Sequence, residues 1–347
     1  MAISGAEDAR AENMLTREDA RAENMLTRVV RDLARLLQLR EVNVLIALVV
    51  MGALISFFTP YFLTVDNLMG VSRSFSLTAI MSIGMVMVII TGGIDLSVGS
   101  AMGLAGLITA LCFDLHYSQA FSIAAGLGVG LLFGLSNGLL VTVMELPPFI
   151  ATLGTLSIGR GFMYMITHGV PLTPAPPDSF SFLGQGYIGP VPVPVVILLV
   201  LTVVFSLVMV RTRFGRHVYA TGGNENAARL SGVKTNRVKL AVYVLSSMIS
   251  SLAGVIAFSR YLSAEPASGF GSELEVIAAA AIGGASLAGG IGSVTGAVVG
   301  AALIGEIANG VVLLNVNTYA QQAITGGVII IAVSLDMLRG KLRGRRG

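Results

Sequence analysis

Ten apolar runs separated by short polar stretches constrain this sequence more than any other feature. They cover approximately residues 42–62, 69–91, 97–113, 119–143, 149–167, 191–211, 238–262, 274–289, 293–314 and 319–338. A helix crosses a bilayer with about 20 predominantly apolar residues, and most runs have this length, although the third and eighth are short. Only 12% of the residues are charged, which is low for a soluble domain. We therefore expect an all-α integral membrane protein, a polytopic bundle of about ten transmembrane helices.

The basic residues indicate which loops face the cytoplasm. All of the lysines and arginines except Arg73, Arg160 and Arg260 lie before residue 41, within 211–239 or within the C-terminal tail. Positive charge collects on the cytoplasmic side of membrane proteins, so both termini are expected to be cytoplasmic, as an even number of crossings requires. The loop 168–190 has no lysine or arginine and is expected outside. Nucleic-acid binding is not expected, because no soluble domain presents these charges.

The chain divides into four parts. Residues 7–17 and 18–28 carry the same eleven letters, EDARAENMLTR, so 1–28 is a duplicated, charged N-terminal tail. Residues 29–41 alternate leucine and valine with arginine at helical spacing, which predicts an amphipathic interfacial helix in contact with membrane lipid. The transmembrane domain covers 42–338, and 339–347 is a basic cytoplasmic tail.

No catalytic constellation is present in the sequence. The three histidines are isolated, and neither an HExxH nor a CxxC pattern occurs. Gly340-Lys341 is followed by Leu342, which does not match the GxxxxGK[ST] loop that binds nucleotide phosphates. We expect no catalytic residue, no metal site and no cofactor. If transport is driven by ATP, another chain must hydrolyse it.

Polar residues within or between the apolar runs are the candidates for a translocation path. Arg160 and Glu306 fall near the middle of two runs, where an ionisable side chain is costly unless it meets a partner or a cavity. Each could instead be part of an internal ion pair. Asp95 and Ser97 lie in the GGIDLSVG turn at 92–99, where Asp95 could contact a ligand or cap the next helix. Other intramembrane polar residues, Asn137 and Asn309, are interpreted as partners in interhelical hydrogen bonds.

Glycine is concentrated in residues 280–300. Such a tract allows helices to approach closely, and it also permits a broken helix around a translocation path. Both interpretations remain open from the sequence. A weak internal echo accompanies it, because GGI at 92–94 recurs as GGI at 289–291.

Between two long apolar runs lies a polar, basic island, Gly215–Lys239. Asn224 can cap a helix there, Glu225 falls in its first turn, and Gly232 can end it. A short capped helix is a rigid lever. The alternative is an ordinary basic loop whose role is to set topology.

Residues 225–232, ENAARLSG, resemble the Glu-Ala-Ala…Gly loop of ABC importer permeases, with Asn226 as an inserted residue. Further stretches at 92–100, 147–161, 219–239 and 277–301 strengthen the match. As a set they resemble the monosaccharide branch of these permeases, which takes up ribose, xylose, galactose or autoinducer-2.

The resemblance implies a translocation subunit of the bacterial inner membrane that is not itself an enzyme. The partners it implies are ABC ATP-binding subunits, a periplasmic sugar-binding protein, and a second permease copy or a paralogue. In that family a helix of the cytoplasmic loop, here 212–237, docks on the ATP-binding subunit. The residues expected to carry this coupling are Asn224, Glu225, Ala227, Ala228, Arg229, Leu230 and Gly232.

The alternative function is that of a secondary transporter or channel. A secondary transporter or channel driven by an ion gradient usually carries ionisable residues near the midplane of several helices. Here only Arg160 and Glu306 qualify. Reconstitution of the chain alone in vesicles separates the two classes, because only the secondary transporter would move solute without an ATP-binding partner.

Overall fold

A computed structural model describes residues 40–317 together with residues 323, 324, 326, 327, 330 and 334. The predicted N-terminal tail, the C-terminal tail and nearly all of the predicted interfacial helix lie outside the described residues. In chain order the elements are α2 (Arg40–Phe58), α3 (Val65–Ile90), α4 (Val98–Asp114), α5 (Gln119–Thr142), α6 (Pro148–Thr167), α7 (Asp178–Gln185), β1 (Tyr187–Ile188), β2 (Val191–Pro192), α8 (Val193–Arg211), α9 (Arg213–Gly223), α10 (Glu225–Leu230), α11 (Thr235–Tyr261), α12 (Ser272–Ile282) and α13 (Val294–Leu313).

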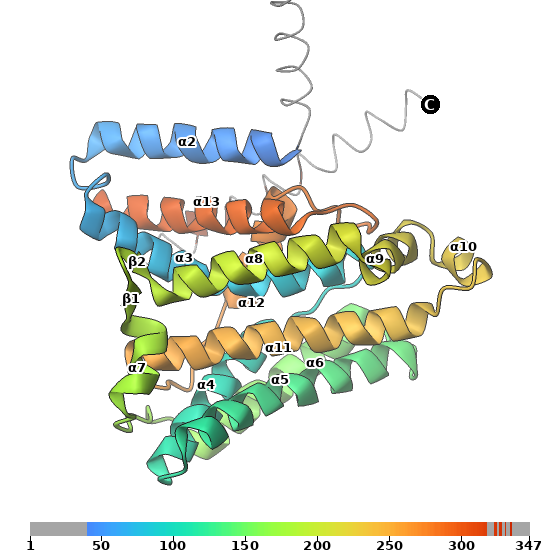
Figure 1. Ribbon diagram of the computed structural model, residues 1–347, viewed down its shortest axis with the longest axis horizontal. Helices are drawn as coiled ribbons and strands as arrows, with labels where there is room; N and C mark the ends of the chain where they lie inside the picture. Colours follow the sequence, from blue (N-terminus) through green and yellow to red (C-terminus); the bar gives the residue numbers. More distant parts are fainter. Residues whose placement is uncertain (1–39, 318–322, 325, 328–329, 331–333, 335–347) are drawn as a thin grey trace, which may run out of the picture.

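The long helices run roughly along one axis of the molecule, with α7 and the β1–β2 hairpin at one end and α9 and α10 at the other (Figure 1). α3 and α11 form the centre, where most of their side chains are buried. A third or less of α5, α6 and α8 is buried, and their exposed side chains include Leu132, Phe162 and Leu199. A surface of this kind suits lipid rather than water.

Small residues bring the central helices into close contact. Gly134 of α5 lies against the main chain of Val244 in α11, and Gly254 of α11 lies against the carbonyl of Met102 in α4. A side chain at either glycine would collide with the neighbouring backbone. In a bilayer, where lipid tails are as apolar as leucine, this close packing is a main source of helix association.

Each of the first nine predicted apolar runs contains one helix of the described chain. Six of these helices are long and apolar enough to cross a membrane, namely α3, α5, α6, α8, α11 and α13. α4 and the apolar part of α2 are shorter. The tenth run, 319–338, lies mostly outside the described residues. The helical membrane fold agrees with the prediction, and the count of about ten crossings stays a prediction.

The eighth run differs from its prediction. Residues 274–289 were expected to form one span, but α12 has 11 residues and ends at Ile282. Such a helix is about 16 Å long, roughly half the thickness of the hydrocarbon core. The chain then continues without helix to Ser293, and Gly284, Gly289 and Gly290 in this segment have φ of +93°, +89° and +76°. These left-handed conformations favour glycine and cannot continue a right-handed helix.

Both interpretations of the glycine tract therefore describe part of it. The helix is broken, and the same tract packs closely, because Gly283 lies against the main chain of Gly296 and Gly300 lies against the carbonyl of Ala279. The contacts hold α12 against α13 across the break.

The polar loops contain structure that the sequence did not predict. The loop after α6 contains α7 and the hairpin in which Tyr187 pairs with Pro192. Leu172 and Ala264 exchange main-chain hydrogen bonds and join this loop to the one after α11. At the other end, loop 212–237 contains two helices, α9 and α10, where one was expected.

Candidate functional site

α10 is the short helix predicted in the basic island, and its two ends are as expected. The side-chain oxygen of Asn224 accepts a hydrogen bond of 2.9 Å from the main-chain N–H of Ala227. This satisfies one of the free donors in the first turn. The helix ends at Leu230, and Gly232 follows with φ of +86°. The helix, its cap and its glycine stop are confirmed.

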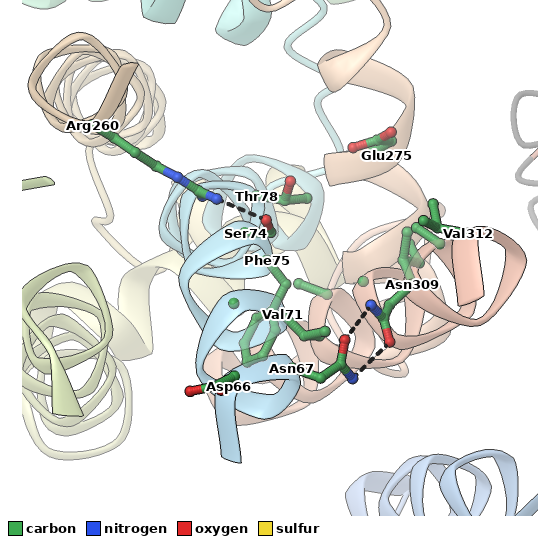
Figure 2. Close-up of a pocket in the computed structure, with 15 residues that line it drawn as sticks. Asp66, Asn67, Val71, Ser74, Phe75, Thr78, Arg260, Glu275, Asn309 and Val312 are labelled. Atoms are coloured by element: carbon green, nitrogen blue, oxygen red, sulfur yellow. Dashed lines mark hydrogen bonds between the residues drawn. The ribbon is translucent and has the colours of Figure 1, made fainter. Parts of the chain in front are cut away.

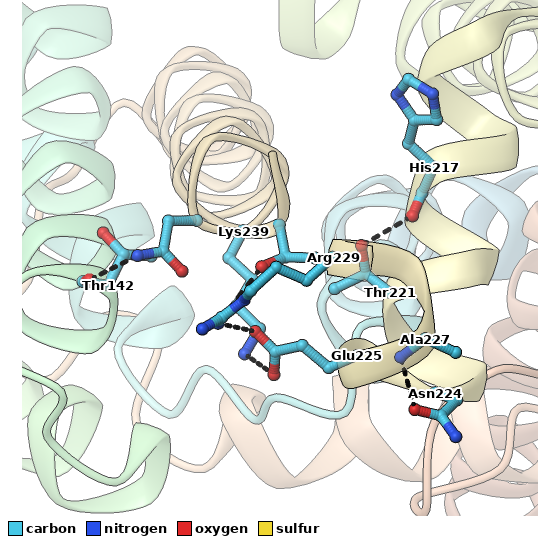
Figure 3. Close-up of polar contacts among 10 residues, drawn as sticks. Thr142, His217, Thr221, Asn224, Glu225, Ala227, Arg229 and Lys239 are labelled. Atoms are coloured by element: carbon cyan, nitrogen blue, oxygen red, sulfur yellow. Dashed lines mark hydrogen bonds and ion pairs between the residues drawn. The ribbon is translucent and has the colours of Figure 1, made fainter. Parts of the chain in front are cut away.

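Glu225 fastens α10 to α11. Its carboxylate accepts a hydrogen bond of 2.6 Å from the ammonium of Lys239 in α11 and one of 3.2 Å from the guanidinium of Arg229 in α10 (Figure 3). Burial raises the pKa of Glu225, while the hydrogen bond and charge of Lys239, with smaller contributions from Thr235 and Arg229, lower it by more. The net result is a pKa below the ordinary value of 4.5, so the carboxylate is ionised at neutral pH.

The opposite side of α10 is free. Ala228 is buried against the protein, whereas Ala227, Arg229 and Gly232 are exposed and Leu230 is 91% exposed. α10, which carries Leu230, lies at one end of the bundle, past the ends of the long helices (Figure 1). α10 is thus fixed on one side and presents an apolar side chain with a cation beside it on the other.

α9 connects α10 to the interior through close main-chain contacts. Gly222, near the end of α9, lies against the carbonyl of Ile90, the last residue of α3, and a side chain there would not fit. The same carbonyl accepts a hydrogen bond of 2.8 Å from the N–H of Gly290 in the broken segment. Tyr219 of α9 donates a hydrogen bond of 2.8 Å to the carbonyl of Gly292.

The two GGI stretches meet at this point. A side chain at Gly289 would approach both the main chain of Gly92 and the carbonyl of Gly222 to about 3 Å. The turn between α3 and α4 and the break between α12 and α13 therefore lie against each other and against α9. The two GGI stretches, at 92–94 and 289–291, therefore contact each other through Gly92 and Gly289.

Asp95 and Ser97 lie in a buried polar network rather than along an open path. One Asp95 oxygen accepts hydrogen bonds from the Ser97 N–H (3.0 Å) and hydroxyl (2.6 Å). Asn137 of α5 donates to the Ser97 hydroxyl at 2.7 Å and accepts from Thr155 of α6, also at 2.7 Å. Among the residues that the structure describes, none donates a hydrogen bond to the second, buried Asp95 oxygen. The network joins three helices at the start of α4.

Arg160 holds a loop against α6. Its guanidinium donates to the carbonyls of Ser268 at 3.0 Å and Gly269 at 2.8 Å, and it lies 3.6 Å from the carboxylate of Glu273. Glu273 is therefore the partner that the ion-pair interpretation of Arg160 requires. Arg160 ties α6 to the segment that leads into α12.

Glu306 of α13 is 8% exposed and faces Gly52 of α2. Within the described part of the chain, one of its carboxylate oxygens has no hydrogen-bond partner. The structure brings Asp95 and Ser97 together but places Arg160 and Glu306 elsewhere, so the four candidates do not form one site.

A polar cavity that the sequence did not predict lies between α3, α12, α13 and the end of α11 (Figure 2). Its volume is about 520 Å³. Asp66, Arg260, Glu275, Ser74 and Thr78 supply its polar groups. Asn67 and Asn309 form a pair of amide hydrogen bonds at 3.1 and 2.9 Å along one wall. The interhelical role predicted for Asn309 is confirmed, and so is that of Asn137.

The chain was compared with known proteins. A family model described as branched-chain amino acid transport system / permease component matches residues 67–333. The ribose import permease protein RbsC of Escherichia coli (strain K12) is 40% identical over 301 residues, which cover 86% of this chain and 94% of that protein. RbsC of Bacillus subtilis (strain 168) is 38% identical, covering 86% and 93%. The L-arabinose transport system permease protein AraH of Escherichia coli (strain K12) is 35% identical, covering 87% and 92%. No solved structure matches the chain.

Proposed function

Because this chain belongs to the family of ABC transporter permease components, we propose that it is the membrane-spanning translocation subunit of an ATP-driven importer for a monosaccharide or a similar small polar solute. It is a transport subunit rather than an enzyme. The closely similar permeases are named for ribose and L-arabinose, which supports a sugar as the solute.

The observation that carries the coupling part of the proposal is the arrangement of α10 and α9. α10 is capped, pinned to α11 through Glu225 and Lys239, and exposes Leu230 at one end of the bundle. A rigid helix with one free apolar side chain suits a groove on a partner. We propose that the residues Asn224, Glu225, Ala227, Ala228, Arg229, Leu230 and Gly232 couple the chain to an ATP-binding subunit.

A displacement of α10 has a short route into the membrane domain. α9 touches Ile90 at the end of α3 and Gly292 in the broken segment, so a movement of α9 acts on both at once. Both contacts lie where a helix is interrupted, and interrupted helices form the substrate and ion sites of many transporters. In this proposal, closure of the ATP-binding pair pushes α10, and α9 passes the movement to the two glycine turns.

The partners follow from the same proposal. They are two ATP-binding subunits, a periplasmic sugar-binding protein at the end that carries α7, and a second permease copy or a paralogue. The chain would lie in the bacterial inner membrane with both termini in the cytoplasm, which agrees with the basic charge near 211–239.

The test is reconstitution in vesicles of the chain with and without its ATP-binding subunits. Uptake of radiolabelled ribose or arabinose should require ATP, the ATP-binding subunits and the loaded binding protein. Uptake by the chain alone, driven by an ion gradient, would instead establish a secondary transporter and refute the importer proposal.

A further inference from the structure

The polar cavity occupies one half of the bundle. It extends from Asp66 and Asn67, at the start of α3, to Thr78, which lies roughly 18 Å further along that helix. Beyond Thr78 every residue of α3, 79–90, is buried. The cavity therefore begins at the end that carries α7 and stops about halfway to the end that carries α10 (Figure 1, Figure 2).

Gln185, the last residue of α7, helps to place the arginine of this cavity. Its side-chain amide donates a hydrogen bond of 3.0 Å to the carbonyl of Arg260, and its own carbonyl accepts one of 3.3 Å from Arg73. The Arg260 guanidinium then donates to the carbonyl of Arg73 at 2.9 Å and to the hydroxyl of Ser74 at 3.0 Å. The Arg260 guanidinium is thus held in position by Arg73 and by Gln185 of α7, at the end of the bundle where the cavity begins.

The polar side chains of the cavity carry both charges and both hydrogen-bonding types. Arg260 of α11 supplies donors, and Glu275 of α12, which lies beside the Thr78 hydroxyl, supplies acceptors. Within the described residues no ion pair joins Arg260 to Glu275. These two opposite charges lie beside Ser74 and Thr78, where together they favour neither a cation nor an anion, and the carboxylate of Asp66 adds an acceptor at the start of α3. A ligand whose groups both donate and accept would use both side chains, as well as the hydroxyls of Ser74 and Thr78.

The remaining wall of the cavity is apolar. Phe75, Ile304 and Val312 line it, and Gly305 lies directly against Phe75, which keeps that side of the cavity open. The amides of Asn67 and Asn309 hydrogen-bond to each other at the cavity wall. A volume of about 520 Å³ falls in the range of small-molecule sites, roughly 300–1,000 Å³.

We propose that this cavity is a transit site for a neutral polyhydroxylated ring, a monosaccharide, on its way through the permease. The inference rests on the proposed function and deepens it by naming the residues that meet the sugar. Arg260 and Glu275 bind its hydroxyl groups, while Phe75, Ile304 and Val312 meet its C–H face. A second hollow, of about 720 Å³ between α4, α5 and α6, lacks charged groups in its lining and does not suit such a ligand.

Cysteine accessibility tests the proposal in the complete complex. Cys112 is the only cysteine of the chain, so Thr78→Cys in a Cys112→Ser background carries one reactive thiol. A small, charged methanethiosulfonate reagent should modify it and block uptake. Sugar-loaded binding protein with ATP should slow the modification severalfold. Thr173→Cys, in the exposed loop after α6, is the matched control and should react at the same rate with or without sugar.

Two substitutions test the binding chemistry. Glu275→Gln and Thr78→Val remove an acceptor and a donor without a large change of shape, and each should lower the rate of sugar uptake about tenfold, the effect of one good hydrogen bond. The ATPase activity stimulated by the binding protein should persist in both. Glu145→Gln, at the opposite end of the bundle and exposed, should leave uptake unchanged.

The possible failures are distinguishable. If the unmodified complex takes up no sugar with ATP, the proposed function fails. If that complex transports, but Thr78→Cys is unreactive or is modified at the same rate with and without sugar, the transit site is refuted. Normal uptake by both Glu275→Gln and Thr78→Val would also refute it.

Discussion

Gly222 of α9 packs against the main-chain carbonyl of Ile90, the last residue of α3, with no space for a side chain between them. The carbonyl is already engaged by the N–H of Gly290, so three segments that are distant in the sequence meet at one oxygen atom. This contact joins the polar loop directly to the membrane domain. In the proposed function it carries the movement of α10 to the spans, and disturbing it tests that proposal.

Gly222→Ala should therefore reduce coupled transport and also destabilise the fold. Overpacking at such a contact costs about 1–3 kcal/mol, because the backbone must shift. Gly223→Ala is the matched control, since nothing lies within contact of a methyl group there. Thermal unfolding and ATP-driven uptake measure both effects. Equal thermal stability and equal uptake in the two variants would show that the contact of Gly222 with Ile90 contributes to neither.

Leu230→Ser should weaken the complex with the ATP-binding subunit without changing the stability of the permease itself. Leu230 is 91% exposed, so its replacement costs nothing within the chain, whereas burial of a leucine at an interface is worth about 1.5–3 kcal/mol. The affinity should fall by about tenfold to a hundredfold. Leu115→Ser, exposed at the end of α4 on the opposite side, should leave the affinity unchanged. If Leu230→Ser leaves the affinity for the ATP-binding subunit unchanged, the proposal that α10 docks on that subunit is refuted.

The parts of the fold that the sequence predicted depend on local pattern. The apolar runs have the length of a bilayer span, and the cap at Asn224 depends on residues three positions apart. α9 was missed although Phe214, Val218 and Thr221 recur at helical spacing, because its glycines and polar residues suggested a loop. The sequence could not decide between close packing and a broken helix after Ile282, because an apolar composition does not determine the backbone angle φ.

The cavity could not be predicted because its residues are distant in the sequence. Asn67 and Asn309 are 242 positions apart, and Arg260 acts with Ser74 across 186 positions. No local pattern distinguishes such residues from polar groups that only join helices. Arg160 and Glu306 are the opposite case. Their positions in apolar runs made them candidates for one path. In the structure Arg160 contacts the loop before α12, and Glu306 contacts α2.

The attachment of α10 through Glu225 should depend on pH. The folded-state pKa of Glu225 lies below 4.5, its ordinary value, so the folded state binds fewer protons near that pH. The stabilisation is present above pH 4.5 and is lost as the pH falls through the lower, folded pKa. A spin label at Leu230→Cys, in a Cys112→Ser background, should keep the same mobility above pH 4.5 and become more mobile as the pH falls below 4.5 through the lower, folded pKa.

Glu225→Gln provides the control for this pH dependence. The amide cannot ionise, so the label should be mobile at every pH and show no transition. A transition of the same size in Glu225→Gln would assign the effect to another group.

Arg160→Met should destabilise the contact between α6 and the segment that leads into α12. Two hydrogen bonds from a cationic donor to the carbonyls of Ser268 and Gly269 are lost, which costs on the order of 2–4 kcal/mol. Glu273→Gln should cost clearly less, because that carboxylate is 3.6 Å away and makes no short hydrogen bond with Arg160. Unfolding in detergent measures both. A larger effect for Glu273→Gln would make the ion pair the main interaction.

Asp95 offers a test between its two interpretations, the helix cap and the ligand contact. Asparagine retains an acceptor for the N–H and hydroxyl of Ser97. It also removes a buried charge whose second oxygen has no hydrogen-bond partner in the described part of the chain. Asp95→Asn should therefore be as stable as the original chain or more stable. Asp95→Ala leaves the Ser97 N–H without an acceptor and should cost about 1–3 kcal/mol.

Transport by the Asp95→Asn complex then decides the role. If Asp95 only orders the turn before α4, uptake should stay within about twofold of the original rate, since a loss of 0.4 kcal/mol or less changes a rate constant by about that factor. Uptake abolished in a variant of full stability would show that the carboxylate itself acts in transport. We expect the first result, because Asp95 is 0% exposed and its hydrogen bonds go to Ser97, whose hydroxyl also binds Asn137.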